Sequence, residues 1–301
     1  MALDVKELMA KVGRIRLLTN RLIDDELSGN YHSTFKGQGV EFDEVRPYEI
    51  GDDVRSIDWN VTARTGMPFI KRYSEERELT ILFLVDVSGS LSYGSLGKTK
   101  AELAAEVTAL LALTAIRNQD KVGLILFSDK ILKYIPPRKG RDSVMRLARE
   151  VLAAGDDAQG GTDIAEALKF LNSIRKRRAV VFLVSDFIIP SISAREEFEK
   201  LVRATARRHD MISVSVSDPA EGEMPDVGVV ELEDPETGEI TIVDTSSAAV
   251  RKAFAETAQA EKLELERFFV KSSLDAISLS TDKPYIDEVR SLFRRRACKR
   301  K

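Results

Sequence analysis

The 301-residue sequence predicts an α/β fold in which a mostly parallel β-sheet is covered by helices on both faces. Apolar runs at 79–86, 121–128 and 179–186 each end in a polar residue, as strands do when both faces of their sheet are buried. Segments with the helical spacing of apolar residues lie between these runs. Strands that alternate with helices of about 10–15 residues are typical of βαβ units and therefore of a parallel sheet.

The same patterns predict the individual elements in chain order, and no internal repeat interrupts them. Helical spacing indicates a helix within 1–28, and spaced glycines among many charges indicate short strands and turns over 29–78. After the apolar run at 79–86 we expect a helix at 99–118, strands at 121–128 and 131–135 before Pro136 and Pro137, and helices at 142–154 and 163–175. A strand at 179–186, a helix at 194–208 and a strand at 211–218 should follow. The last expected elements are a hairpin within 227–245 that turns at 235–238, a helix at about 247–268, a strand at 275–280 and a final short helix.

The expected domain organisation follows from this order. Residues 1–78 form an N-terminal helix and a charged segment, 79–280 form the sheet domain, and 281–301 form a C-terminal helix with a basic tail.

The composition is that of a soluble globular protein, since 43% of the residues are hydrophobic and 32% are charged. The 46 basic and 49 acidic residues give a net charge of −3, so no overall field draws the protein to nucleic acid or to a membrane. Two basic clusters, at 175–178 and from Arg294 onward, are expected to be a solvated face and a frayed terminus.

The number of cysteines and the length of the apolar segments indicate the cellular compartment in which the protein is expected. Cys298 is the only cysteine, so the chain has no disulfide framework and fits a reducing environment. The first residues carry charges every few positions, unlike a secretory signal, and no stretch approaches the roughly 18 apolar residues of a membrane span. We expect a cytoplasmic protein without a membrane span.

Polar side chains at the ends of the predicted strands point to a metal site. In open α/β sheets, ligands bind at the carboxyl ends of the strands. The sequence Asp86-Val-Ser88-Gly-Ser90 follows the first apolar run, Thr162 follows two glycines, and Asp186 ends the run at 179–186. Mg²⁺ prefers carboxylate, hydroxyl and water oxygens, so these five residues predict a Mg²⁺ site, with Mn²⁺ and Ca²⁺ as open alternatives.

Each of these residues also has a simpler interpretation. Ser88 and Ser90 are residue types that form turns and cap helices, and Asp186 suits a loop cap. Thr162 is suited to cap the helix that opens at Asp163. The combination of all five in this order is far more specific than any single position.

The metal-site pattern resembles that of the von Willebrand factor A superfamily, which has a Rossmann-type sheet and uses a DxSxS motif, a separate Thr and a separate Asp in this order. The preceding segment, VEFDEVRPYEIGDDVRSIDWNVTARTGMPF from Val40 onward, is similar to a block of the bacterial and archaeal family catalogued as domain of unknown function 58. The first resemblance covers about residues 79–280, and the block runs from Val40 to Ser90.

These resemblances imply a function. They imply a non-enzymatic module that holds a divalent cation at a metal-ion-dependent adhesion site and binds a Glu or Asp carboxylate of a protein partner. Genes of this family often lie beside those of MoxR-type AAA+ ATPases, which implies work with such an ATPase in assembly, metal insertion or a chaperone-like role. The hairpin at 227–245 and the charged segment at 40–78 are further candidate partner surfaces. Within the charged segment, Tyr48 and Trp59 are expected to pack the segment onto the sheet.

The sharpest alternative is a P-loop-like nucleotide-binding protein. The segment from Gly94 to Thr99, GSLGKT, follows a strand and opens a helix, but the first glycine of the P-loop motif would fall at Ser92. An aspartyl phosphatase would need an acid at position 88, which is serine. His32 and His209 are not near a nucleophile motif, and we expect each to be structural or exposed.

Overall fold

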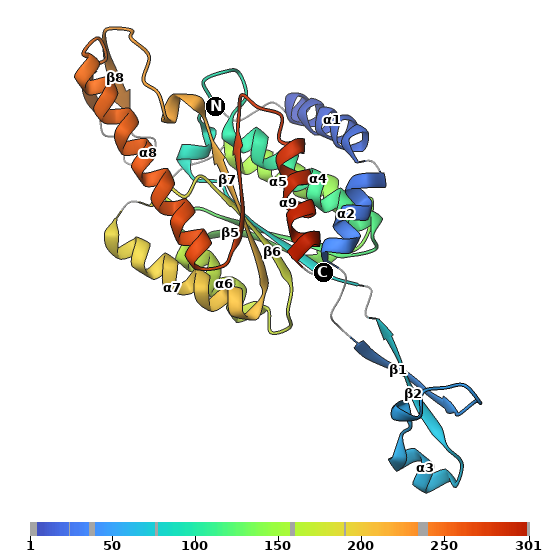
Figure 1. Ribbon diagram of the computed structural model, residues 1–301. Coiled ribbons are helices and arrows are strands. Elements are labelled where there is room, and N and C mark those ends of the chain that lie inside the picture. Colours follow the sequence, from blue (N-terminus) through green and yellow to red (C-terminus); the bar gives the residue numbers. More distant parts are fainter. Residues whose placement is uncertain are drawn as a thin grey trace. The chain divides into compact units, whose positions relative to one another are not determined.

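The computed structural model of the protein describes residues 5–23, 25–35, 40–75, 78–156, 160–189, 191–233 and 240–299 (Figure 1). Its contacts divide the chain into two compact units. One unit comprises Met1–Thr34 and Thr80–Lys301, and the other comprises Phe35–Leu79. The helical residues before position 35 therefore group with the sheet, whereas the expected boundary at 78 placed them with the charged segment.

The larger unit is built on a six-stranded sheet. Its strands are β3 (Thr80–Asp86), β4 (Lys121–Phe127), β5 (Ile131–Arg138), β6 (Val180–Ser185), β7 (Asp210–Ser217) and β10 (Asp275–Ser280). They lie in the order β10-β7-β6-β3-β4-β5, and all neighbours are parallel except β4 and β5. The chain adds strands on one side of β3 and then on the other, so the topological switch point lies between β3 and β6.

Helices cover both faces of this sheet. They are α1 (Val5–Leu22), α2 (Asp25–Phe35), α4 (Lys100–Arg117), α5 (Arg141–Asp156), α6 (Ile164–Ile174), α7 (Ile192–Arg208), α8 (Ala248–Lys271) and α9 (Ile286–Lys299). Figure 1 shows α1, α4, α5 and α9 on one side of the sheet and α6, α7 and α8 on the other. The predicted α/β class with helices on both faces is confirmed. No helix in the described ranges combines the length and the apolar composition that a membrane crossing requires.

The core explains why the strands are continuous apolar runs. Leu82 and Leu84 of β3 pack in one buried cluster with residues of α6, α7 and the end of α8. The intervening residue Phe83 points to the opposite face, where it stacks on Phe182 of β6 with ring centroids 5.3 Å apart. Because both faces of β3 and β6 are buried, neither strand has room for alternating polar residues.

Several elements differ from the sequence prediction. The single helix expected within 1–28 is two helices with a break at Ile23, and α2 continues through Gly29 into the region expected to hold strands and turns. β5 runs through Pro136 and Pro137 instead of stopping before them. It is the edge strand of the sheet, where a missing backbone donor is tolerated.

The C-terminal half contains the expected hairpin and one correction. β8 (Val229–Glu233) pairs antiparallel with β9 (Ile240–Asp244), while the expected turn at 235–238 lies outside the described residues. The basic tail is not simply frayed, because α9 reaches Lys299 and Arg296 is buried. Its guanidinium donates to Asp210 Oδ2 at 2.6 Å and to Asp275 Oδ2 at 2.8 Å, which ties α9 to the first residues of β7 and β10. Cys298 is exposed.

The smaller unit is an antiparallel hairpin of β1 (Val40–Pro47) and β2 (Phe69–Glu75), with a 3₁₀ turn η1 (Val54–Ser56) and helix α3 (Trp59–Thr65) between the strands. Helix α3 was not predicted, although Asp58 caps it by accepting from the backbone N–H groups of Asn60 and Val61. Charged residues of this unit pair with one another, as in Arg46 with Asp52 at 2.7 Å.

The two aromatic residues that were expected to pack the smaller unit onto the sheet differ in exposure. Trp59 is 70% exposed, so its side chain is not packed within this unit. Tyr48 is half-buried, and its backbone N–H donates to the Pro68 carbonyl at 2.9 Å.

Candidate metal centre

The two predicted aspartates lie at the switch point of the sheet. Asp86 is the last residue of β3, and Asp186 directly follows the last residue of β6. Because β3 and β6 are parallel neighbours with Val85 opposite Val184, their ends reach the same edge of the sheet. Ser185 Oγ links them further by donating to Asp86 Oδ2 at 2.7 Å. This is the place where open α/β sheets bind ligands.

The serines of the DxSxS motif connect the two aspartates. The Ser88 backbone N–H donates to Asp86 Oδ1 at 2.9 Å, and the Ser88 and Ser90 hydroxyls are 3.1 Å apart. Ser90 Oγ then donates to Asp186 Oδ2 at 2.7 Å. Four of the five predicted residues therefore belong to one chain of hydrogen bonds. Ser88 precedes the 3₁₀ turn η2 (Gly89–Ser92) without capping it through its side chain, so the simple capping interpretation fails for Ser88.

The loop that carries Thr162 lies against the same motif. The Gly89 backbone N–H donates to the Gly160 carbonyl at 3.3 Å, and the Asp163 N–H donates to the Ser128 carbonyl at 2.8 Å. Thr162 itself is half-buried. It does not cap α6, because Asp163 is the N-cap residue and its side chain accepts from the Glu166 backbone N–H. The alternative of Thr162 as a helix cap is therefore wrong.

Asp186 is oriented by an unusual backbone. Phe187, the next residue, has φ 59°, in the left-handed region that a bulky side chain rarely adopts. Its N–H donates to Ser185 Oγ at 3.0 Å, and its ring packs edge-on against Phe269 at 5.4 Å. The Ile188 N–H donates to Asp186 Oδ1 at 3.2 Å, so Asp186 caps its own loop as well as accepting from Ser90. Such local strain is often retained at functional sites.

The electrostatics of the site favour a cation. Asp86 is fully buried. Burial, and after it the charge of Asp186, raises the pKa of Asp86 to about 7, against the opposing hydrogen bonds from Ser185 and Ser88. Two carboxylates this close repel each other, and a positive charge between them would relieve that repulsion.

Sequence reasoning missed the cation that the structure places here. Lys100, the first residue of α4, is fully buried, and its ammonium donates to Asp186 Oδ2 at 2.7 Å and to Glu221 Oε1. Burial alone would lower the pKa of Lys100, but Asp186 and Glu221 outweigh it and raise that pKa. The capping box formed by Thr99 and Glu102 fixes the start of α4 at Lys100, but it does not indicate which carboxylates Lys100 meets.

Glu221 is held in place by the loop after β7. It ends the 3₁₀ turn η3 (Pro219–Glu221), and its Oε2 accepts from the Asp218 backbone N–H at 2.9 Å. Asp218 in turn accepts from the Ser95 N–H at 3.0 Å and from Thr281 Oγ1 at 2.6 Å. These contacts fix the loop after β7 beside the loop that follows β3.

The P-loop alternative fits this geometry poorly. Lys98 Nζ pairs with Glu106 Oε2 at 2.7 Å and lies over the Tyr285 ring. Thr99 caps α4 by accepting from the Glu102 N–H at 3.1 Å. The two side chains that would bind phosphate and its metal in a P-loop therefore both have structural partners at the start of α4.

The donor set at the switch point suits a hard divalent ion. It consists of two carboxylates, two linked hydroxyls and the nearby Thr162, all of which present oxygen. Within the described ranges no cluster of three or more His, Cys, Asp and Glu side chains could hold a metal ion. The proposed site has only two carboxylates, so hydroxyl oxygens must supply the remaining protein ligands.

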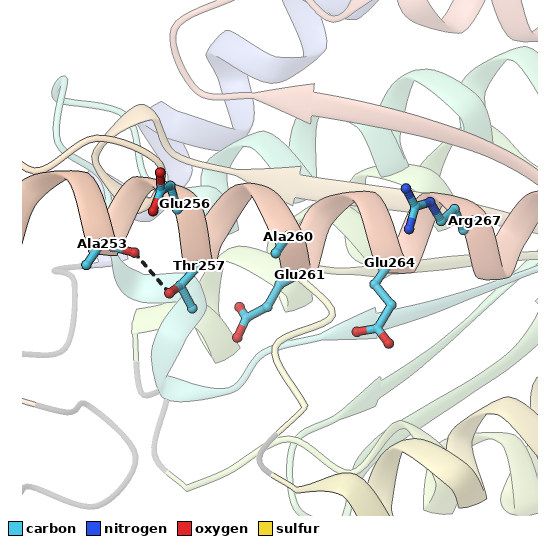
Figure 2. Close-up of a pocket in the computed structure, with 7 residues that line it drawn as sticks. All are labelled: Ala253, Glu256, Thr257, Ala260, Glu261, Glu264 and Arg267. Carbon is cyan, nitrogen blue, oxygen red and sulfur yellow. Dashed lines mark hydrogen bonds between the residues drawn. The ribbon is translucent and has the colours of Figure 1, made fainter.

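A hollow along α8 is separate from this donor set. Figure 2 shows the residues that line it, all of them on α8: Ala253, Glu256, Thr257, Ala260, Glu261, Glu264 and Arg267. No residue of the predicted metal set is among them. Its one marked hydrogen bond, from Thr257 Oγ1 to the Ala253 carbonyl at 2.9 Å, lies within the helix.

Comparisons with known proteins give four matches. The family model described as "Protein of unknown function DUF58" matches residues 44–264. The uncharacterized protein Rv1480 of Mycobacterium tuberculosis is 31% identical over 289 residues, which cover 95% of this chain and 89% of the relative. Among solved structures, BatB from Bacteroides thetaiotaomicron has a TM-score of 0.46 at 15% identity, over 73% of this chain and 99% of that one. A von Willebrand factor type A structure from Catenulispora acidiphila has a TM-score of 0.35 at 13% identity, over 63% and 43%.

Proposed function

The chain belongs to the DUF58 family of proteins of unknown function, and we propose that it acts there as a non-enzymatic protein-binding module whose binding depends on a divalent cation. The observation that carries this proposal is the chain of hydrogen bonds from Asp86 through Ser88 and Ser90 to Asp186. It joins oxygen donors from two strand ends at the switch point of the sheet.

In this proposal Asp86, Ser88, Ser90, Thr162 and Asp186 hold the cation, with Mg²⁺ the first candidate and Mn²⁺ or Ca²⁺ the alternatives. A bound cation of this kind would supply a coordination position for a carboxylate oxygen of a partner's Glu or Asp. The protein's own contribution is to fix the donors. Ser185 holds Asp86, and the backbone at Phe187 directs Asp186 toward Ser90.

The partner is proposed to be a protein. The resemblance described from the sequence points to a MoxR-type AAA+ ATPase, in an assembly or chaperone-like role. The exposed β8–β9 hairpin and the smaller unit at 40–78 are proposed as additional contact surfaces.

A pair of neighbouring serines tests the metal site. Ser90 and Ser92 lie in the same 3₁₀ turn, but Ser92 Oγ donates only to the Gly89 carbonyl at 2.7 Å, whereas Ser90 bonds Asp186. Ser90→Ala should weaken Mn²⁺ binding by at least roughly 10- to 100-fold, the loss seen when even an outer-shell partner of a metal ligand is removed. Ser92→Ala should leave Mn²⁺ binding unchanged. Isothermal titration calorimetry with Mn²⁺ measures both.

Partner capture is measured with the same proteins. Immobilised wild type and Ser92→Ala should retain the ATPase or another partner from cell extract in Mg²⁺, and release it in EDTA. Ser90→Ala should fail to retain it under either condition. Equal retention by all three proteins, or retention that ignores the chelator, would rule out metal-dependent binding.

A further inference from the structure

Lys100 is the cation of the candidate site in this structure. Its side chain is 0% exposed, and its ammonium bonds two carboxylates that lie 86 and 121 residues further along the chain. Burying an ammonium costs free energy unless the charge is paired. Lys100 can be buried because its ammonium donates hydrogen bonds to the carboxylates of Asp186 and Glu221.

Lys100 uses the oxygen that links Asp186 to the serines. Asp186 Oδ2 accepts from Lys100 at 2.7 Å and also from Ser90 Oγ at 2.7 Å. The other oxygen, Oδ1, accepts from the Ile188 N–H. An incoming cation that uses Asp186 Oδ2 therefore meets an ammonium already bonded to the same atom.

The two acceptors of Lys100 are not equivalent. The Asp186 side chain is 2% exposed and belongs to the predicted metal set, whereas the Glu221 side chain is 28% exposed and does not. Glu221 is anchored independently, since its other oxygen accepts from the Asp218 N–H. Lys100 can therefore give up Asp186 and keep a carboxylate partner in Glu221.

On the basis of the function proposed above, we propose that Lys100 is a built-in competitor of the divalent cation. It pairs with Asp186 while the site is without metal, and it moves to Glu221 alone when a cation takes Asp186. Lys100 thus holds the donors in place in the metal-free protein and limits how tightly the cation binds. Glu221 sets the balance between these two states.

This arrangement predicts opposite effects for two substitutions. Lys100→Met removes a positive charge next to the cation and frees Asp186 Oδ2, so Mn²⁺ should bind at least about tenfold more tightly. Glu221→Gln removes the second acceptor of Lys100, while the Gln carbonyl can still accept from the Asp218 N–H. Lys100 then depends on Asp186 alone, and Mn²⁺ should bind about tenfold or more weakly.

The experiment measures Mn²⁺ affinity of the full chain by titration calorimetry, and the melting temperature in EDTA and in Mn²⁺. Lys98→Met is the matched control, because Lys98 lies two residues away and pairs with Glu106 outside the site. It should match wild type in Mn²⁺ affinity. Lys100→Met should melt lower than wild type in EDTA, and Mn²⁺ should raise its melting temperature more than it raises that of wild type.

The outcomes separate this inference from the proposed function. If Mn²⁺ binds wild type but Lys100→Met binds it equally or more weakly, Lys100 is a structural residue only and the inference fails alone. If both Lys100→Met and Glu221→Gln change affinity in the same direction, the inference fails as well. If neither wild type nor Lys100→Met binds Mn²⁺, both proposals fail. If Lys100→Met does not fold, a Glu221→Gln affinity equal to that of wild type still overturns the inference.

Discussion

His209 is a buried titratable side chain outside the candidate metal centre. It lies between α7 and β7, and neither ring nitrogen has a hydrogen-bond partner among the described residues. Burial, and after it the positive charges of Arg208, Arg175 and Arg178, lowers the pKa of His209. Of the two histidines, His209 is structural, while the side chain of His32 lies outside the described residues.

The lowered pKa of His209 makes stability depend on pH. The folded protein binds a proton at His209 less readily than the unfolded chain, whose histidine has a pKa of about 6.5. The contribution of His209 to stability is therefore complete above about pH 6.5 and is lost as the pH falls below it, through the folded-state pKa. We expect the free energy of unfolding, measured with urea, to fall more between pH 7.5 and pH 5.5 for wild type than for His209→Phe.

The comparison with His209→Phe is needed because Asp86 acts in the opposite direction. Its pKa is raised to about 7, so the folded protein binds this proton more readily than the unfolded chain and gains stability as the pH falls. The Asp86 contribution cancels in the difference between wild type and the variant. Parallel pH profiles for the two proteins would contradict the role assigned to His209.

At the residue level the sequence could predict the oxygen donors but not the ammonium. Asp86 and Asp186 end apolar strands, and the topology of parallel sheets brings strand ends together, so their proximity follows from pattern alone. Lys100 and Glu221 come from a helix start and from a short turn, and no periodicity relates those two elements. Their pairing depends on side-chain reach within the folded chain, which a single sequence does not encode in any spacing.

At the element level, the contact of β4 with β5 requires a glycine. A Cβ atom at Gly123 would lie 2.8 Å from the Ile135 carbonyl oxygen and 2.9 Å from the Pro137 nitrogen. Both are backbone atoms, which cannot turn aside as the end of a side chain can. The edge strand therefore approaches β4 closely at the point where the ladder shifts its register.

Gly123→Ala should consequently destabilise the protein by about 1–3 kcal/mol, because overpacking at this position must shift backbone. Gly13→Ala is the control, since Gly13 lies inside α1 and its added Cβ would meet no atom within 4 Å apart from its chain neighbours and the nearby backbone of its own helix. It should stabilise the protein by roughly 0.5–1 kcal/mol through helix propensity. Thermal or urea unfolding of the two variants measures these changes, and a neutral Gly123→Ala would contradict the close approach.

The sequence predicts best those elements in which burial determines the pattern of apolar residues. β3, β4 and β6 are apolar on both faces, and their helices carry clear apolar stripes, so their order and class were expected. Pro136 and Pro137 were misleading because strand propensity does not reveal which strand lies at an edge. Helix α3 was missed because it is only seven residues long and is stabilised by the Asp58 cap instead of an apolar face.

At the scale of the whole molecule, the parts proposed to contact a partner are distinguished by apolar side chains that they expose on their surface. The β8–β9 hairpin exposes Val229, Ile240 and Ile242 on one face of its two strands. The smaller unit exposes Ile50, Val54, Trp59 and Met67. Neither surface could be predicted in detail from the sequence, because exposure of an apolar residue depends on which neighbours the fold provides.

The central claim is that Asp86, Ser88, Ser90, Thr162 and Asp186 converge on one divalent cation, and crystals of the full chain grown with Mn²⁺ test it most directly. An anomalous difference map should show one strong peak within about 2.5 Å of the Asp86, Ser88 and Ser90 side-chain oxygens, at ordinary metal–oxygen distances. The Lys100 ammonium should then be bonded to Glu221 and not to Asp186. A map without a peak at the ends of β3 and β6, at a Mn²⁺ concentration that saturates binding in solution, would contradict the account.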